Sequence, residues 1–344
     1  MSTASVAALS IPGIISAQTP TNPGNQPTGQ RTLPSSMPAW EAGTVSPGWE
    51  PGDSDSFTRY YFDSLMLETR YIDSDIPSTR LRLFDESFDT PIMTAALSHL
   101  RGTEDEESGI VVYSKAAKEC NAVNWMGMCT DEDFNKVMAT GAKTIRVIKP
   151  YEDNDDIIKT IRYSAKQKNC LAVGMDIDHS FNGRGGYDVV MGEKMKAKKT
   201  DDLKKFVKAS KVPFILKGVL SASDAKKCLD AGVSGIVISH HGGRVKYSIP
   251  PLMALEQIAD AVGGKMKIFI DCGILSGMDA YKCLALGADA VSVGRHLIPL
   301  IQQGTDKVAA RLKEMTNELA GVMSATGVRS LDRRDPTVIH RTIL

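Results

Sequence analysis

The segment GIVISHHGGR, residues 235–244, combines the residue types of an acid–base site. An apolar run ends at Ser239 and is followed by two histidines, two glycines and an arginine. His241 offers a base that titrates near neutral pH, and Arg244 offers a planar fork that fits a carboxylate. A single histidine is usually structural, but the neighbouring glycines allow a tight turn that brings both side chains to one place. The segment therefore predicts His241 as a base and Arg244 as an anion holder.

Asp176 and Lys217 each end an apolar run elsewhere in the chain. A carboxylate at Asp176 could orient the base His241 and stabilise its protonated form. An aspartate in that place could also begin a helix as its N-cap. Lys217, if buried, needs a partner for its charge. Two chemistries stay open for it: a Schiff base with a carbonyl substrate, or a fixed cation beside an anion that develops on a cofactor.

Two segments late in the chain contain glycine next to polar residues. KIFIDCGILSG includes Asp271 and Gly273, and DAVSVGR ends with Gly294 and Arg295. Backbone N–H groups in such turns bind phosphate, and an arginine adds charge-assisted hydrogen bonds. The glycines could instead serve only the turns. We expect a phosphate site here, occupied by a phosphate-bearing cofactor.

Short β-branched runs alternate with amphipathic helical segments from about residue 88 onward. We expect strands at Pro91–Ala96, Ala122–Met126, Thr144–Ile148, Leu171–Asp176, Pro213–Lys217, Gly235–Ser239, Lys267–Asp271 and Ala290–Gly294. We expect helices at Glu104–Lys118, Asp131–Thr140, Asp155–Gln167, Asp201–Ala209, Ala222–Ala231, Pro251–Val262, Gly277–Leu286 and Asp306–Met323. This alternation predicts an α/β fold, a (β/α)8 TIM barrel with an extended N-terminal arm. An open doubly wound sheet is disfavoured because no GxGxxG turn follows the first strand. In a barrel, chemistry lies at the carboxyl ends of the strands, where the polar residues named above recur.

The composition is that of an ordinary globular protein. The 41 Lys+Arg balance the 41 Asp+Glu, and 42% of the residues are hydrophobic. These values argue against a disordered chain and against broad nucleic-acid binding, which usually needs net positive charge. No apolar run reaches the roughly 20 residues of a membrane span. The 6 cysteines and 6 histidines are not spaced as ligands, so we expect buried thiols, no disulfide framework and no metal site.

Residues 1–52 differ from the rest of the chain. They hold half of the 16 prolines and a single basic residue, Arg31. Such a segment cannot fold alone, so we expect a low-complexity arm or linker followed by a barrel domain over 53–344. The stretch ASVAALSIPGIISA resembles the apolar part of an export signal without its basic region. We expect a cytoplasmic protein as written, or an exported one if a twin-arginine start lies upstream of Met1.

Two long segments carry a resemblance to a known family. KGVLSASDAKKCLDAGVSGIVISHHGGR and MALEQIADAVGGKMKIFIDCGILSGMDAYKCLALGADAVSVGRHLI resemble the FMN-dependent α-hydroxy acid oxidase/dehydrogenase family, which includes glycolate oxidase, lactate oxidase and mandelate dehydrogenase. The resemblance is strong over about 212–332, weaker over about 59–177 and absent over 1–52. It implies oxidation of a 2-hydroxy acid to the 2-keto acid with bound FMN, reoxidation by oxygen or another electron acceptor, and a homotetramer.

The resemblance also implies roles by position. His241 corresponds to the catalytic base, Asp176 to its partner, and Arg244 to the residue that holds the substrate carboxylate. Lys217 corresponds to the lysine beside the flavin N1–O2 edge, where a fixed cation stabilises the reduced flavin. The other residues implied to bind the cofactor are Ala95, Ala96, Leu97, Asn124, Ser239, Asp271, Gly273, Gly294 and Arg295. Residues 178–199 would form a mobile loop over the substrate.

The chain departs from the family pattern around the substrate and the phosphate. Leu275 stands where the family has an arginine, and Val147 and Lys149 stand where it has a glutamine and a tyrosine. Gly174 replaces a flavin-contacting threonine. We expect Lys149 and Arg184 to help bind the substrate. An unusual 2-hydroxy acid, or weak activity on common ones, would follow. The alternatives are a non-redox barrel enzyme, either a Schiff-base aldolase or a phosphosugar isomerase, and a flavin-binding homologue with lost or changed activity.

Overall fold

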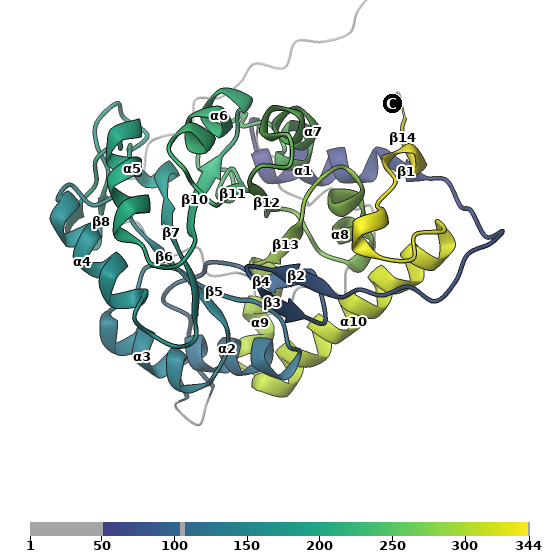
Figure 1. The fold of residues 1–344 in the computed structure, drawn as a ribbon, viewed down its shortest axis with the longest axis horizontal. Coiled ribbons are helices and arrows are strands. Elements are labelled where there is room, and N and C mark those ends of the chain that lie inside the picture. Colours follow the sequence, from purple (N-terminus) through teal and green to yellow (C-terminus); the bar gives the residue numbers. More distant parts are fainter. Residues whose placement is uncertain (1–50, 104–106, 343–344) are drawn as a thin grey trace, which may run out of the picture. The chain divides into compact units, whose positions relative to one another are not determined.

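The computed structural model describes residues 51–103 and 107–342. Eight parallel strands form one sheet in the spatial order β4-β13-β12-β11-β10-β7-β6-β5 (Figure 1). These strands are β4 (Ile92–Thr94), β5 (Asn124–Met126), β6 (Thr144–Ile148), β7 (Cys170–Asp176), β10 (Phe214–Val219), β11 (Gly235–Ile238), β12 (Lys267–Ile270) and β13 (Ala290–Val293). The end strands β4 and β5 are joined, because the Thr94 N–H donates to the Val123 carbonyl at 3.2 Å and the Trp125 N–H donates to Thr94 Oγ1 at 2.8 Å. The sheet therefore closes into the predicted barrel. The predicted arm and export signal lie, up to residue 50, outside the described residues.

Helices follow the strands and cover the outside of the barrel (Figure 1). They are α2 (Gly109–Glu119), α3 (Asp131–Ala139), α4 (Asn154–Ser164), α5 (Thr200–Ala209), α6 (Ala222–Asp230), α7 (Pro251–Val262), α8 (Gly277–Ala285) and α10 (Thr305–Ala325), with the short α9 (Ile298–Ile301) before α10. Every strand and helix expected from the alternation is present, with ends shifted by a few residues. No helix in the described part of the chain is both long and apolar enough to cross a bilayer.

Several helices begin where a polar side chain satisfies a free backbone N–H. Thr130, Ser221 and Ser276 accept the N–H groups of residues 133, 224 and 279, which starts α3, α6 and α8. The helix predicted from Glu104 begins only at Gly109. Residues 104–106 lie outside the described residues, Glu107 and Ser108 are not helical, and the Thr103 N–H donates to the Glu107 carbonyl at 3.1 Å.

Some elements were not expected from the alternation. Helix α1 (Ser54–Asp63) precedes the barrel, and β1 (Leu65–Leu67) pairs with β14 (Ile339–Arg341) from the other end of the chain. Two hairpins, β2–β3 (Leu81–Leu83 and Glu86–Phe88) and β8–β9 (Val189–Val190 and Glu193–Lys194), complete the set together with the 3-10 turns η1 (Ile177–His179), η2 (Arg295–Leu297), η3 (Leu331–Arg333) and η4 (Pro336–Val338). These strands are two or three residues long, so their sequences carry little periodicity.

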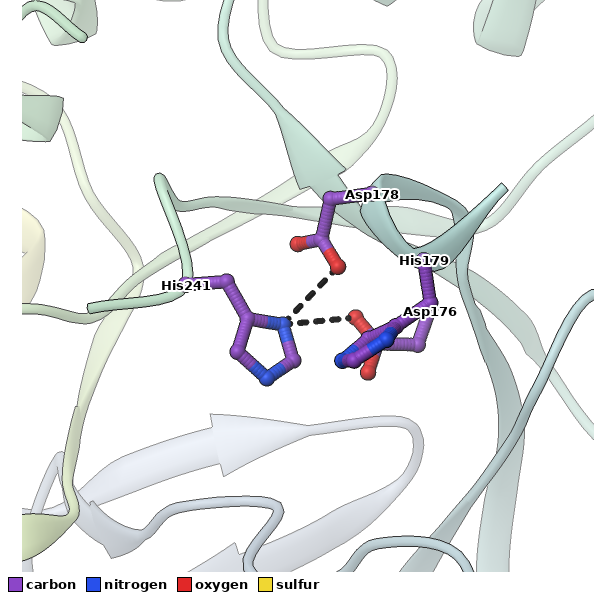
Figure 2. A group of neighbouring side chains, drawn as sticks. All are labelled: Asp176, Asp178, His179 and His241. Carbon is purple, nitrogen blue, oxygen red and sulfur yellow. Dashed lines mark hydrogen bonds and ion pairs between the residues drawn. The ribbon is translucent and has the colours of Figure 1, made fainter. Parts of the chain in front are cut away.

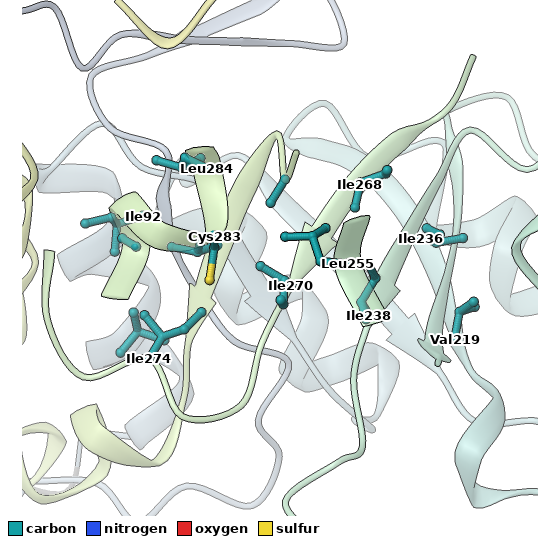
Figure 3. Close-up of a cluster of buried hydrophobic side chains, with 14 of the residues drawn as sticks. Ile92, Val219, Ile236, Ile238, Leu255, Ile268, Ile270, Ile274, Cys283 and Leu284 are labelled. Atoms are coloured by element: carbon teal, nitrogen blue, oxygen red, sulfur yellow. The ribbon is translucent and has the colours of Figure 1, made fainter. Parts of the chain in front are cut away.

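The strands bury side chains on both faces. Ile236 and Ile238 of β11, like Ile268 and Ile270 of β12, point outward to the layer that contains Leu255 of α7 (Figure 3). The residues between them on each strand point into the barrel, because successive side chains of a strand alternate.

The β2–β3 hairpin closes the amino-terminal end of the barrel. Leu81, Leu83 and Phe88 are at most 5% exposed and pack with the interior side chains of the strands. Among these, Trp125 and Phe269 meet edge to face at 5.6 Å between ring centroids. Because this end is filled by side chains, chemistry is left to the carboxyl end.

We predict that Phe88→Ala lowers the free energy of unfolding by about 3–5 kcal/mol, because loss of the ring leaves a cavity in the core at the amino-terminal end of the barrel. Urea denaturation followed by circular dichroism measures the change. Ile76→Ala serves as the control, since Ile76 is 91% exposed. Equal losses for the two variants would contradict the assignment of the hairpin to the core.

Candidate active site

The register of the parallel sheet brings three charged side chains together at the carboxyl end of the barrel. Lys217 of β10 lies opposite Asp176 of β7. Val147 of β6 lies opposite Gly174 of β7, so Lys149 follows at the level of Asp176. The side chains of Lys217, Asp176 and Lys149 are only 6%, 4% and 9% exposed. Their proximity, predicted for Asp176 and Lys217, is thus a consequence of strand pairing.

Lys217 is a cation surrounded by carboxylates. Its Nζ lies 3.5 Å from Asp176 Oδ1, 3.8 Å from Asp178 Oδ2 and 3.6 Å from Asp271 Oδ2. Burial opposes the charge of this ammonium, but the attraction of the carboxylates outweighs burial and raises the pKa of Lys217 well above its ordinary value. A Schiff base requires a neutral amine, so this environment argues against the aldolase alternative.

Asp176 shares its charge with a second lysine. The Nζ of Lys149, predicted to bind substrate, lies 2.5 Å from Asp176 Oδ2. Burial opposes the charge of Asp176, but Lys217, His241 and Lys149 stabilise it, so the pKa of this carboxyl is well below its ordinary value. Burial lowers the pKa of Lys149 in spite of this pairing. The 2.5 Å contact shows that the ammonium of Lys149 is directed at Asp176 rather than at an open substrate site.

His241 lies beside two carboxylates at the barrel mouth (Figure 2). Its Nδ1 is 2.8 Å from Asp178 Oδ1 and 3.3 Å from Asp176 Oδ1. Its backbone has a φ of +54°, and its N–H donates to Ser239 Oγ at 3.1 Å, so a tight turn sets the ring position. Burial and the Lys217 ammonium lower the pKa of His241, but the two carboxylates outweigh them and the pKa is raised. The environment thus favours the imidazolium that a base forms when it takes a proton.

Asp178 is a member of this group that the sequence pattern did not indicate. It lies in the turn η1, directly after β7. On β10, Gly218 has a φ of +93°, and a Cβ on it would lie 2.5 Å from Asp178 Oδ2, so only glycine leaves room for this carboxylate. No local pattern indicates it, because its place depends on the turn η1 and on the absence of a side chain at Gly218.

Arg244, the predicted anion holder, is bound to the segment that follows β7. Its Nε donates to the Asp178 carbonyl at 2.7 Å, and a terminal nitrogen donates to the Phe181 carbonyl at 3.0 Å. The guanidinium also forms an ion pair with Asp188. Burial opposes the charge of Asp188, but Arg244 stabilises it and the pKa of that carboxyl is lowered. A carboxylate of the protein itself therefore sits on the residue expected to hold the substrate carboxylate.

His179 stands edge-on to His241, with 4.6 Å between ring centroids. Its Nδ1 lies 3.3 Å from Asp188 Oδ2. Burial, with the Lys149 ammonium as the second cause, lowers the pKa of His179 to about 3. His179 is therefore neutral at physiological pH.

The ligand atoms of Asp176, Asp178, His179 and His241 all lie within 4.8 Å of one another (Figure 2). Carboxylate and imidazole donors of this kind suit a divalent cation. The ammonium of Lys217 already supplies positive charge to both carboxylates, at 3.5 and 3.8 Å. We therefore assign no metal to this group.

The predicted phosphate end of the site lies against α1. Arg295 is held by Asp55 of α1 through two contacts of 2.7 Å. The hydrogen bond to Asp55 raises the pKa of Arg295. Gly273 approaches α1 closely: its φ is +76°, and a Cβ on it would lie 2.6 Å from Thr58 Cγ2. The arginine expected to bind phosphate therefore already has an anionic partner.

Leu275, which stands where the family has an arginine, is fixed by hydrogen bonds of its backbone. Its N–H donates to Asp279 Oδ2 at 3.0 Å, and its carbonyl accepts from Arg311 at 2.7 Å. The loop after β12 thus directs this N–H to a carboxylate of α8, which leaves fewer donors for a phosphate.

Small residues lie where β4 and β13 end. A Cβ on Gly294 would lie 3.2 Å from the Cβ of Ala95, so the two strand ends approach closely. The Ala95 N–H donates to the Val293 carbonyl at 3.0 Å, while Ala96 and Leu97 are partly buried. The segment predicted to run along a flavin ring is therefore next to Gly294, as expected for neighbouring strands.

Asn124 and Arg184 lie elsewhere than the group around Lys217. The amide of Asn124 is buried, accepts from Thr94 Oγ1 at 3.1 Å and donates to Thr144 Oγ1 at 3.2 Å, so it joins β4, β5 and β6. Arg184 is exposed in a turn. Over residues 51–103 and 107–342, no hydrogen bond or ion pair joins its guanidinium to the site. The predicted roles of these two residues stay predictions.

An open cleft of about 890 Å³ lies between the loops after β4, β5 and β6 and the β8–β9 hairpin. Tyr151, which follows Lys149 by two residues, lines it, but Lys149, Asp176, Lys217 and His241 are not among its lining residues. Its acidic lining residues are Asp133, Glu152, Asp153, Asp156 and Glu193. This lining suits a polar or cationic group rather than an anion.

Comparison with known proteins identifies a matching family. The model of the family described as FMN-dependent dehydrogenase matches residues 37–200 and 184–341. An L-lactate oxidase of Roseobacter sp. is 38% identical over 159 residues, which cover 45% of this chain and 43% of that protein. A peroxisomal (S)-2-hydroxyacid oxidase of Arabidopsis thaliana is 27% identical over 279 residues, covering 70% of this chain and 75% of that protein.

Two further comparisons extend over most of the chain. An FMN-dependent alpha-hydroxy acid dehydrogenase of Schizosaccharomyces pombe is 26% identical over 330 residues, covering 81% of this chain and 80% of that protein. A crystal structure of mandelate oxidase superposes with a TM-score of 0.74 at 23% identity, covering 86% of this chain and 91% of that one. The structural likeness supports the barrel fold.

We predict that Asp188→Asn tightens the binding of a small carboxylate, because it removes the anion that competes for Arg244. A gain of about tenfold, or about 1.4 kcal/mol, is expected. Isothermal titration with oxalate measures it, and Asp201→Asn on the solvated side of α5 is the control. Weaker binding to Asp188→Asn would show that Asp188 holds Arg244 in place for the ligand.

Proposed function

Since the chain belongs to the FMN-dependent dehydrogenase family, we propose that it oxidises a 2-hydroxy acid to the 2-keto acid at the carboxyl end of the barrel. The observation that supports this most directly is the group around His241. Its Nδ1 lies 2.8 Å from a carboxylate and 3.2 Å from the ammonium of Lys217. A base and a fixed cation are thus adjacent, which is what proton removal next to a developing negative charge requires.

The residues present fit FMN at the end of the site near Lys217. Lys217 is a buried cation, and Ser239 Oγ lies 3.3 Å from its Nζ as a further polar group. Ala95 and Gly294 put little side-chain bulk at the adjoining strand ends. At the phosphate end, Arg295 and the backbone near Gly273 would hold the cofactor once Asp55 releases the arginine. FMN, when bound, accepts the two electrons that leave the substrate.

The side chains of the chain divide the remaining work. Arg244 binds the substrate carboxylate through its planar fork. Conversion of a 2-hydroxy acid to a 2-keto acid releases two electrons and two protons. His241 takes one of the protons at Nε2 because its Nδ1 faces Asp178 and Asp176. The two electrons would go to the bound flavin together with the other proton. The two carboxylates stabilise the resulting imidazolium. Lys217 stabilises negative charge that develops on the cofactor.

The substrate and the electron acceptor are proposed only by class. The relatives include lactate and (S)-2-hydroxyacid oxidases. We further propose oxygen or another electron acceptor, and a homotetramer. The ion pair between Arg244 and Asp188 favours low turnover of common substrates. It is also the observation that favours a second candidate function, that of a flavin-binding homologue with lost or changed activity.

We predict that His241→Ala retains bound FMN and loses turnover by about 10²–10⁴-fold, because it removes the base. The absorbance spectrum of the purified protein reports the flavin, and anaerobic mixing with a panel of 2-hydroxy acids reports its bleaching. His340→Ala is the control, since the His340 side chain is 58% exposed. Unchanged turnover of His241→Ala would remove this histidine from the role of base.

We predict that Asp55→Asn binds FMN about tenfold more tightly, because Arg295 becomes free to bind phosphate. Quenching of flavin fluorescence measures the dissociation constant without any need for turnover. Arg295→Ala should bind FMN more weakly than the unaltered protein, and Asp75→Asn, at an exposed position, should change nothing. If Asp55→Asn instead weakens binding, Asp55 positions Arg295 rather than competing for it.

A further inference from the structure

We propose that Asp178 is the positioning residue of this site, in that its carboxylate fixes the ring of His241 while its backbone carbonyl fixes the guanidinium of Arg244. The catalytic importance of this residue rests on the proposed function. The contacts of Asp178 with His241 and Arg244 do not, because they lie within the chain. The role differs from the one implied by family resemblance, which gives the partnership with His241 to Asp176.

Distances favour Asp178 over Asp176 as the partner of the ring. Asp178 Oδ1 lies 2.8 Å from His241 Nδ1, within normal hydrogen-bond range, whereas Asp176 Oδ1 is at 3.3 Å. A hydrogen bond from Nδ1 to a carboxylate fixes the tautomer and leaves the lone pair of Nε2 free. Asp178 therefore sets which nitrogen of His241 can accept a proton.

The distribution of charge leads to the same assignment. Asp176 Oδ2 is bound to Lys149 at 2.5 Å, and its Oδ1 lies 3.5 Å from Lys217. Asp178 Oδ2 is buried without a hydrogen-bond partner among the described residues, and its nearest ammonium, that of Lys217, is 3.8 Å away. Although Asp176 exerts the larger attraction on the protonated ring, its charge is already shared between two lysines. Asp178 keeps a less compensated charge for the imidazolium.

The local structure places Asp178 between the two working side chains. The turn η1 brings its carbonyl to Arg244 Nε at 2.7 Å and its carboxylate to His241. Gly218 makes room for the carboxylate, since a Cβ there would lie 2.5 Å from Asp178 Oδ2. Burial raises the pKa of Asp178, which agrees with a carboxylate that lacks full compensation.

Charged and titratable groups face His241 from each neighbouring element. They are Asp176 of β7, Asp178 and His179 of η1, and Lys217 of β10, with Lys149 of β6 behind Asp176. Any pH measurement on His241 must therefore compare variants at Asp178 with variants at Asp176.

The test follows His241 directly by nuclear magnetic resonance of the full chain labelled with ¹⁵N-histidine. The His241→Gln variant assigns the signal. In the unaltered protein we expect the proton on Nδ1. In Asp178→Ala we expect a mixture of tautomers and a pKa of His241 lower by about one unit, a tenfold loss of proton affinity. In Asp178→Asn, which keeps an acceptor oxygen but no charge, we expect the pKa to fall while the tautomer is retained. Asp201→Asn on the solvated face of α5 is the matched control.

Turnover gives a second readout. Because Arg244 is held by the backbone carbonyl, Asp178→Ala should leave KM for the hydroxy acid within about threefold while kcat falls at least about tenfold. A base must be neutral to act, so a lower pKa of His241 moves the acid limb of the kcat/KM profile to lower pH. A merely structural effect would instead change KM and kcat together.

The outcomes separate this inference from the proposed function. If the tautomer and pKa of His241 are unchanged in Asp178→Ala, or change only in Asp176→Asn, Asp178 is not the positioning residue. If both change as expected but no 2-hydroxy acid is oxidised by the unaltered protein, the positioning role stands and the proposed reaction fails.

Discussion

A buried ammonium among carboxylates is the interaction on which the site depends. Lys217 joins Asp176 on β7, Asp178 on the following turn and Asp271 after β12, all at 3.5–3.8 Å. Lys217 offsets part of the cost of burying these groups, because an uncompensated buried charge costs several kcal/mol, and Lys149 adds a second cation at Asp176. Lys217 also keeps His241 from holding its proton too firmly, since it opposes the attraction of Asp176 and Asp178. The position of Lys217 is set by its pairing with β7.

Internal carboxylates also occupy both arginines that the site would use for anions. Arg244 is paired with Asp188, and Arg295 is paired with Asp55. A ligand must therefore exchange with a protein carboxylate rather than enter a free site, which lowers its net binding free energy by the strength of the pair it displaces. This exchange gives a physical reason to expect modest affinity for small anions. Because Asp188 lies in the segment after β7 and Asp55 lies on helix α1, the positions of these two segments affect how tightly an anion binds.

Much of the fold was predictable, because barrel strands and helices carry strong local periodicity. Thr144–Ile148 and Pro251–Val262 were predicted with the same bounds as observed. The β2–β3 and β1–β14 pairs were not, since three-residue strands show no periodicity and β14 meets β1 from the far end of the chain. In the site, Lys217 was predicted because it ends an apolar run, and His241 because it follows one. Asp178 was not, because its role depends on a turn and on the absence of a side chain at Gly218.

The amino-acid sequence by itself determined the order of the elements and which chemical groups stand at the carboxyl ends of the strands. It could do so because side-chain alternation and chain direction are local properties. Only the tertiary structure decided which charges are paired. Asp178 meets His241 across 63 positions of the chain, and Asp55 meets Arg295 across 240. Such pairs depend on where loops and α1 come to rest on the closed barrel, and no local pattern encodes that.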